Sequence, residues 1–266
     1  MLGTLAGRAR DARNRRILGD DVAVQVMAGL DPRTRQLAES ELGVTDDAAT
    51  SVALRARMID DRVRACLQRA PDAVVLHLGC GLATRYERLA PAESVTWFDV
   101  DQPPVIALRA HLLGGDTPTH RLVAGDVVDP RILDGVPTGR PTLLVAEGLT
   151  MYLTPETGGA LLARVVDRFG GSAGPNGMVF DVFSRLGIRL QVVNSVVRRS
   201  GSRLEWGVDD PRALERLGLR LEEDLTVSDM LDVGAPYVSE HAADLYRRLV
   251  RFGPMRRMAR ILRYSF

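Results

Sequence analysis

Short apolar runs and helix-like stretches alternate through the middle of this 266-residue chain. Five of the runs have the apolar content of strands buried in a parallel sheet, and turn residues separate them from helical patterns. The alternation predicts the α/β class, with strands connected by right-handed crossovers. The strands are expected within Val74–Arg85, Trp97–Asp101, Val123–Asp129, Thr142–Leu153 and Gly177–Ser184, and the helices at Val105–Leu113 and Pro155–Phe169.

The segments on either side of this alternation have a different pattern. Residues 1–70 are rich in Arg, and Leu54, Met58 and Ile59 are among the apolar residues that recur there at helical spacing. We therefore predict an N-terminal helical cap at residues 1–70 and the core at residues 71–266. Beyond residue 201 the expected elements are a helix at Pro211–Leu217, a strand at Leu219–Leu225, a helix at Glu240–Arg251 and a terminal strand at Ala259–Phe266.

An apolar stretch, Arg185–Arg199, interrupts the alternation directly after the fifth strand. A helix that is apolar on both faces must bury one face against the sheet and cover something else with the other. We predict a lid insertion over residues 185–210 that roofs an apolar ligand. A partner chain in a homo-oligomer is the alternative occupant.

Glycines and acidic residues end the predicted strands where a ligand would bind. Gly79 and Gly81 follow the first strand, and their turn lets the backbone approach a ligand closely. The helix that begins at Thr84 turns free N–H groups toward the same place, although Thr84 replaces the third glycine of a GxGxxG motif. Three acids at strand ends suit a ligand with ribose hydroxyls, an exocyclic amine and an ammonium group. These acids are Asp101, Asp126 and Glu147.

Composition and charge exclude several classes of partner. The chain has 35 basic and 34 acidic residues, and its net charge of +1 gives no electrostatic reason to expect nucleic acid or an anionic membrane. Every basic residue is Arg, which we interpret as the codon bias of a GC-rich bacterial genome. Cys66 and Cys80 are too few for a zinc site, and no signal peptide or membrane span is evident. A soluble protein of the reducing cytoplasm is expected.

Four ordered motifs carry a family resemblance: LGCGLATR, FDVDQP, AGDVVD and AEGLTMYL, within the region from Arg55 to Leu153. Together they resemble the leucine carboxyl methyltransferase family, and especially its bacterial branch of tetracenomycin-type polyketide O-methyltransferases. The resemblance continues more loosely to the C-terminus. It implies a Rossmann-like class I methyltransferase sheet and S-adenosyl-L-methionine as cofactor. Methyl transfer from a sulfonium is an in-line displacement that requires no metal, so none is expected. It also favours a carboxylate on a small natural product as the methyl acceptor.

The glycine loop and two acids receive cofactor roles from geometry and from the resemblance. Gly79 and Gly81 should lie under the methionine part of the cofactor. Asp101 lies 22 residues after Gly79 and should accept hydrogen bonds from the ribose hydroxyls, as the corresponding acid does in dinucleotide folds. We prefer it to Asp99 because it matches the ribose-binding Asp of the family. Glu147 matches a Glu near the amino group of the cofactor.

The remaining cofactor contacts are assigned by resemblance. Asp126 matches the Asp that binds the adenine amino group, with the Val127 backbone beside it. Arg55 matches an Arg that binds the cofactor carboxylate, and Arg57 is the alternative. A surface ion pair of Arg55 with Asp60 or Asp61 is the competing structural explanation.

Some residues depart from the family pattern or have two explanations. Ala83 stands where the family has Asp, which puts one cofactor contact in question. His77 is expected to satisfy backbone at a strand end, and His111 and His120 are expected to be exposed structural residues. Tyr152 is the candidate catalytic residue at the acceptor, with Trp206 as a second pocket candidate, although both could be packing residues.

Three functional hypotheses are therefore consistent with the sequence. The leading hypothesis is O-methylation of a small natural product at a carboxylate, because a carboxylate is already ionised at neutral pH and needs only positioning. Methylation of a protein or peptide carboxyl group is the second. The third is a cofactor-binding cyclase or regulatory protein that transfers no methyl group, which only Ala83 favours.

Overall fold

A seven-stranded sheet organises the chain in the computed structural model, which describes residues 1–14, 17–41, 44–171, 174–190, 203–238 and 240–266. The strand order is β3-β2-β1-β4-β5-β7-β6. The first five pair in parallel, whereas β7 runs antiparallel between β5 and β6. The predicted α/β sheet is confirmed. The strands are β1 (Val74–Leu78), β2 (Thr96–Asp101), β3 (His120–Ala124), β4 (Thr142–Ala146), β5 (Gly177–Phe183), β6 (Arg220–Thr226) and β7 (Ala259–Ser265).

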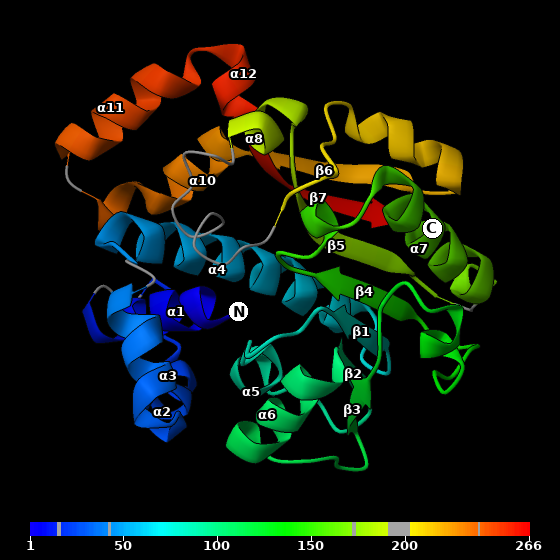
Figure 1. The fold of residues 1–266 in the computed structure, drawn as a ribbon. Coiled ribbons are helices and arrows are strands. Elements are labelled where there is room, and N and C mark those ends of the chain that lie inside the picture. The colour runs from blue at the N-terminus through cyan, green and yellow to red at the C-terminus, as the bar shows by residue number, and fades with distance from the viewer. Residues whose placement is uncertain (15–16, 42–43, 172–173, 191–202, 239) are drawn as a thin grey trace.

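Helices lie on both faces of this sheet (Figure 1). The α-helices are α1 (Leu2–Asn14), α2 (Asp21–Gly29), α3 (Pro32–Gln36), α4 (Asp46–Arg69), α5 (Arg85–Leu89), α6 (Pro103–Leu113), α7 (Pro155–Phe169), α8 (Arg185–Arg189), α10 (Val227–Gly234), α11 (Glu240–Val250) and α12 (Gly253–Arg256). Shorter helices are the π-helical turn η1 (Leu37–Glu41) and the 3-10 turns η2 (Pro130–Leu133), η3 (Thr150–Tyr152), η5 (Pro211–Leu217) and η6 (Ala235–Tyr237). No described helix is long and apolar enough to cross a bilayer.

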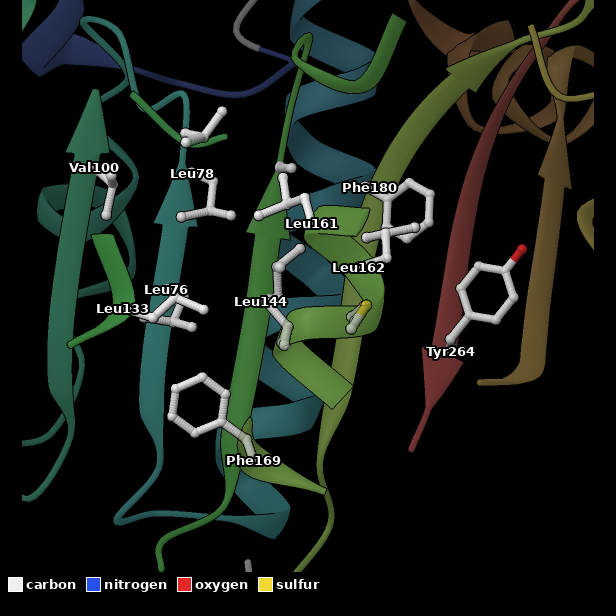
Figure 2. Close-up of a cluster of buried hydrophobic side chains, with 14 of the residues drawn as sticks. Leu76, Leu78, Val100, Leu133, Leu144, Leu161, Leu162, Phe169, Phe180 and Tyr264 are labelled. Atoms are coloured by element: carbon white, nitrogen blue, oxygen red, sulfur yellow. The ribbon is translucent and has the colours of Figure 1, made fainter. Parts of the chain in front are cut away.

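The larger core lies between the sheet and α7. Successive strand residues point to opposite faces, so Leu76, Leu144 and Phe180 share one face. Figure 2 shows these side chains packing against Leu161 and Phe169 of α7. Burial of this apolar layer fixes α7 and the strand that precedes it.

The opposite face of the sheet is covered by α4. Met58 and Ile59 of this helix are buried against Val75, Leu143 and Val179 of three strands. At the carboxyl ends of the strands the same face becomes polar, because the period of two places the acidic strand-end residues there. The apolar layer under α4 is therefore followed, at the carboxyl ends of the strands, by a cluster of polar side chains.

The N-terminal helices form a separate apolar cluster beside this layer. Leu5 and Ala9 of α1 pack with Ala23, Val26 and Met27 of α2. Since α4 both begins in this region and covers the sheet, the predicted division at residue 70 stays a prediction.

Two expectations from the sequence change in the structure, and a third stays untested. Pro211–Leu217 is a 3-10 turn, and Trp206 lies in the large core instead of a ligand pocket, with 7% of its surface exposed. The helix predicted over Arg185–Arg199 is described only as α8, and residues 191–202 lie outside the described part. The lid insertion over 185–210 therefore remains a prediction.

Two adjacent glycines of α7 give a matched test of this packing. A Cβ on Gly158 would lie 2.0 Å from Trp206 Cζ3, whereas nothing lies within 4 Å of a Cβ on Gly159. Gly158→Ala should lower the free energy of unfolding by about 1–3 kcal/mol through overpacking. Gly159→Ala should raise it by up to about 1 kcal/mol through helix propensity. Denaturant unfolding checks both, and equal effects would contradict the packing.

Candidate functional site

The glycine loop after β1 adopts the backbone conformation that its sequence predicts. Gly79 and Gly81 have φ values of 63° and 54°, in the left-handed region that favours glycine. A Cβ on Gly79 would also come within 3.1 Å of Leu149. The N–H of Gly79 donates to the carbonyl of Val100 at 2.8 Å, which holds the loop over the end of β2.

A cavity of about 610 Å³ lies beside this loop. Its volume falls in the range of about 300–1,000 Å³ that is typical of small-molecule sites. The lining comes from α1, α4, the glycine loop and the ends of β2 and β4. Six of the predicted site residues meet there: Arg55, Gly79, Gly81, Asp101, Glu147 and Tyr152.

Asp126 and Val127 do not line this cavity. The Asp126 side chain is exposed and accepts the N–H of Val128 at 3.0 Å, while Val127 is buried in the core. Their loop is nevertheless tied to the site, because the N–H of Gly125 donates to the carbonyl of Asp101 at 2.9 Å. A ligand that extends past Asp101 would reach this loop, so their adenine role stays a prediction.

Asp101 and Asp99 differ sharply in their surroundings. Asp101 is half-buried, and its two carboxylate oxygens accept the N–H groups of Gly81 and Gln102, each at 2.7 Å. Asp99 is fully buried and away from the cavity lining. Burial would raise the pKa of Asp99, but Arg109 and the hydrogen bonds from His120 and His77 hold it well below its usual range. Of these two acids, only Asp101 therefore lines the cavity.

Glu147 lies between two guanidinium groups at the end of β4. Its Oε1 is 3.1 Å from Arg55 Nε, and its Oε2 is 2.5 Å from Arg85 Nη2. Burial would raise the pKa of Glu147, but the charges of Arg55, Arg85 and Arg8 lower it below its usual range. The carboxylate is thus ionised and lines the cavity.

Arg55 is fully engaged by carboxylates. Besides Glu147, its Nη1 lies 3.1 Å from Asp181 Oδ2, and burial raises the pKa of Asp181 despite this contact. The surface pair expected with Asp60 or Asp61 is not formed. The alternative, Arg57, donates to the carbonyl of Ile17 and to Tyr237 and does not line the cavity.

Two arginines of the site had no predicted role. Arg85 is completely buried and joins Glu147 to Asp60 of α4, whose Oδ1 lies 2.7 Å from its Nε. Arg8 of α1 lines the cavity, donates to Asp20 and Leu82, and remains cationic although burial lowers its pKa to about 10. In a chain whose 35 basic residues are all Arg, spacing alone does not single these out.

The ion pairs around Glu147 continue to further charged side chains of alternating sign. Arg88 bridges Asp60 and Asp20, which in turn accepts from Arg8 and Thr84. Four guanidinium groups are therefore interleaved with four carboxylates. These are Arg8, Arg55, Arg85 and Arg88 with Asp20, Asp60, Glu147 and Asp181. The charges of these eight groups balance, so none of them is buried without a partner of opposite sign.

The predictions for two histidines were wrong. His77 contacts the side chains of Asp99 and Arg85 instead of strand-end backbone. His120 is only 6% exposed, and its Nε2 lies 2.7 Å from Asp99 Oδ2. Both were missed because their partner, Asp99, comes from a neighbouring strand. His111 is exposed as expected.

Part of the cavity lining is apolar. Val52, Leu149, Met151 and Phe183 form this part, and Tyr152 stands at the rim with 42% of its surface exposed. Partial burial raises the pKa of Tyr152, so its phenol is protonated at neutral pH. Ala83 also lines the cavity and leaves no side-chain polar group where the family has Asp.

Removal of the Glu147 charge tests the stability of this ion-pair network. In Glu147→Gln two guanidinium groups face an uncharged amide, so the free energy of unfolding should fall by about 3–5 kcal/mol, as for other broken buried pairs. Asp129→Asn is the matched control. It weakens an exposed pair with Arg131, and its cost should stay below about 1 kcal/mol.

The pH dependence of this loss follows from the lowered pKa of Glu147. The unfolded chain takes up the proton near the ordinary value of 4.5, while the folded chain keeps the charge to lower pH. The stability gap between wild type and Glu147→Gln should be constant from about pH 8 to about pH 5, and shrink below that. Denaturant unfolding across this range measures it. A gap that closes near neutral pH would contradict the paired carboxylate.

Comparisons with known proteins identify the family of this chain. The family model described as leucine carboxyl methyltransferase matches residues 1–166. The tetracenomycin polyketide synthesis O-methyltransferase TcmP of Streptomyces glaucescens is 35% identical, over 100% of this chain and 95% of that protein. The S-adenosyl-L-methionine-dependent methyltransferase dpfgK of Gibberella zeae is also 35% identical, over 81% of this chain and 76% of its own.

Solved structures match the fold at low sequence identity. A duf574 family protein from Streptomyces avermitilis has a TM-score of 0.60 at 15% identity, covering 97% of this chain and 96% of its own. Magnesium protoporphyrin IX methyltransferase from Synechocystis has a TM-score of 0.50 at 12% identity, with 96% and 97% covered. The family match and the full-length relative decide the question: the chain belongs to the leucine carboxyl methyltransferase family of S-adenosyl-L-methionine-dependent methyltransferases.

Proposed function

We propose that this enzyme transfers the methyl group of S-adenosyl-L-methionine to a carboxylate oxygen of a small natural product. Full-length similarity to a polyketide O-methyltransferase supports the small-molecule acceptor. The apolar part of the cavity lining supports an acceptor with an apolar body. The cytoplasm is the proposed compartment, since Cys66 and Cys80 are both free thiols.

The cofactor would lie along the glycine loop. Gly79 and Gly81 would contact its methionine part, and Glu147 would accept from the ammonium group. Asp101 would accept from the ribose hydroxyls, and Asp126 with the Val127 backbone would bind the adenine. Arg55 would bind the cofactor carboxylate, and Arg8, which lines the same cavity, would share this contact, while both arginines keep their ion pairs within the protein.

The observation that favours a carboxylate acceptor is the state of the ionisable side chains around the cavity. Among those described there, His77 is bonded to Arg85, Glu147 lies between two arginines, and Asp101 accepts two N–H groups. Burial raises the pKa of the Cys80 thiol and of the Tyr152 phenol, so both stay protonated. Each of these side chains is therefore already hydrogen-bonded or protonated, and none is an unpaired base. An acceptor that is already ionised needs no base.

The chemical step is then an in-line displacement. A carboxylate lone pair forms the new O–CH₃ bond while the S–CH₃ bond breaks and its electron pair returns to sulfur, giving a methyl ester and S-adenosylhomocysteine. The protein contributes alignment and exclusion of water. Tyr152, as a protonated phenol at the rim, would donate a hydrogen bond to the acceptor.

Cofactor binding tests the placement at the strand ends. Asp101→Asn keeps one oxygen for the Gly81 N–H but removes the charge, so S-adenosylhomocysteine should bind about 10- to 100-fold more weakly by calorimetry. Asp167→Asn is the control, since Asp167 is exposed on α7. Asp126→Ala should weaken binding in the same range. If both strand-end variants bound like wild type, the ligand would have been placed wrongly.

The acceptor group is identified by the stability of the product. Candidate natural products incubated with enzyme and cofactor should gain the mass of one methylene. Mild alkali should then release methanol, because it hydrolyses a methyl ester and leaves an aryl methyl ether intact. An alkali-stable product would contradict the carboxylate. Transfer only to proteins or peptides would favour the second hypothesis, and binding without transfer to any acceptor the third.

A further inference from the structure

His77 connects two buried charge clusters. It is 1% exposed on β1, and its Nδ1 lies 2.7 Å from Asp99 Oδ1. Its Nε2 lies 2.9 Å from Arg85 Nη1. One imidazole therefore touches both the Asp99 cluster and the arginine that holds Glu147.

These two contacts fix the protonation state of the ring. A guanidinium group only donates hydrogen bonds, so His77 Nε2 must be the acceptor and carry no proton. The remaining proton sits on Nδ1 and is donated to Asp99. His77 is thus neutral, in the Nδ1–H tautomer.

Arg85 has one partner for each of its three nitrogens. Nε contacts Asp60 of α4, Nη2 contacts Glu147 at the end of β4, and Nη1 contacts His77. Loss of any one contact leaves a buried N–H unsatisfied and lets the guanidinium group turn. The contact to Glu147 depends on that orientation.

We propose that neutral His77 positions Arg85, and through it Glu147, for cofactor binding, and that uptake of a proton by His77 weakens this binding. The inference rests on the proposed role of Glu147 at the ammonium group. A proton on Nε2 would point directly at Arg85 Nη1, so the contact must break.

The charged groups around His77 determine the pH range in which it takes up a proton. Asp99 of β2 faces Nδ1, Arg85 of α5 faces Nε2, and Arg109 of α6 and His120 of β3 reach the same Asp99 carboxylate. Asp60 of α4 and Glu147 of β4 act on His77 only through Arg85. Burial lowers the pKa of His77 despite its bond to Asp99. Cofactor affinity should therefore be constant near neutral pH and fall on the acid side of the ordinary His value of 6.5.

Two substitutions separate the two ring nitrogens. His77→Gln places an amide oxygen near the position of Nε2 and can still accept from Arg85. His77→Asn places an amide near the position of Nδ1, and keeps the Asp99 contact only. Dissociation constants for S-adenosylhomocysteine at about pH 8 should rise about tenfold in His77→Asn and less in His77→Gln. His111→Asn, an exposed His on α6, is the control.

The pH dependence of the affinity for S-adenosylhomocysteine gives a second test. Wild type should lose affinity as the pH falls below 6.5, whereas His77→Gln should lose this dependence. Equal affinities for the Asn and Gln variants, or an unchanged profile in His77→Gln, would overturn the proposal. If Asp101→Asn bound S-adenosylhomocysteine weakly while both His77 variants bound it like wild type, the proposed cofactor site would be supported. Only the role of His77 would then be rejected.

A measurement on the wild-type protein covers the case in which a variant does not fold. Nitrogen chemical shifts of ¹⁵N-histidine-labelled protein distinguish a protonated from an unprotonated ring nitrogen. At neutral pH, His77 should show a protonated Nδ1 and an unprotonated Nε2 in hydrogen-bond contact. A protonated Nε2 would overturn the proposal.

Discussion

The Glu147 carboxylate between Arg55 and Arg85 is the interaction on which the rest of the site depends. A buried charge is stable only when it is paired and hydrogen-bonded, so both arginines must be held at the end of β4. Arg55 comes from α4 and Arg85 from the helix after the glycine loop, and each makes a second ion pair, with Asp181 or Asp60. The network thereby fixes α4 across the carboxyl ends of the strands.

The cavity is a consequence of this arrangement. Because α4 lies over the sheet, α1, which packs against it, comes to lie beside the glycine loop and brings Arg8 to the lining. The lining then includes both paired charges and apolar side chains. A cavity with both kinds of lining is consistent with the proposed pair of a charged methyl donor and an apolar acceptor.

Local features of the sequence predicted most of the fold. Apolar runs gave the five parallel strands, and the glycine loop followed from Gly79 and Gly81, which need positive φ. Asp101 was separable from Asp99 by family resemblance, and the structure brings Asp101 to the cavity. The partners of His77, His120 and Trp206 were not predictable, since each depends on a residue from another element. Arg8 and Arg85 carried no local signal among 35 arginines.

A crystal structure of the complex with S-adenosylhomocysteine tests the central claim most directly. We expect the amino acid part of the ligand beside Gly79 and Gly81, with its ammonium group at Glu147 and its ribose hydroxyls at Asp101. Glu147 should keep its contacts to Arg55 and Arg85 in the complex. A ligand bound elsewhere, for example in the smaller cavity of about 330 Å³ between β3 and η2, would contradict it.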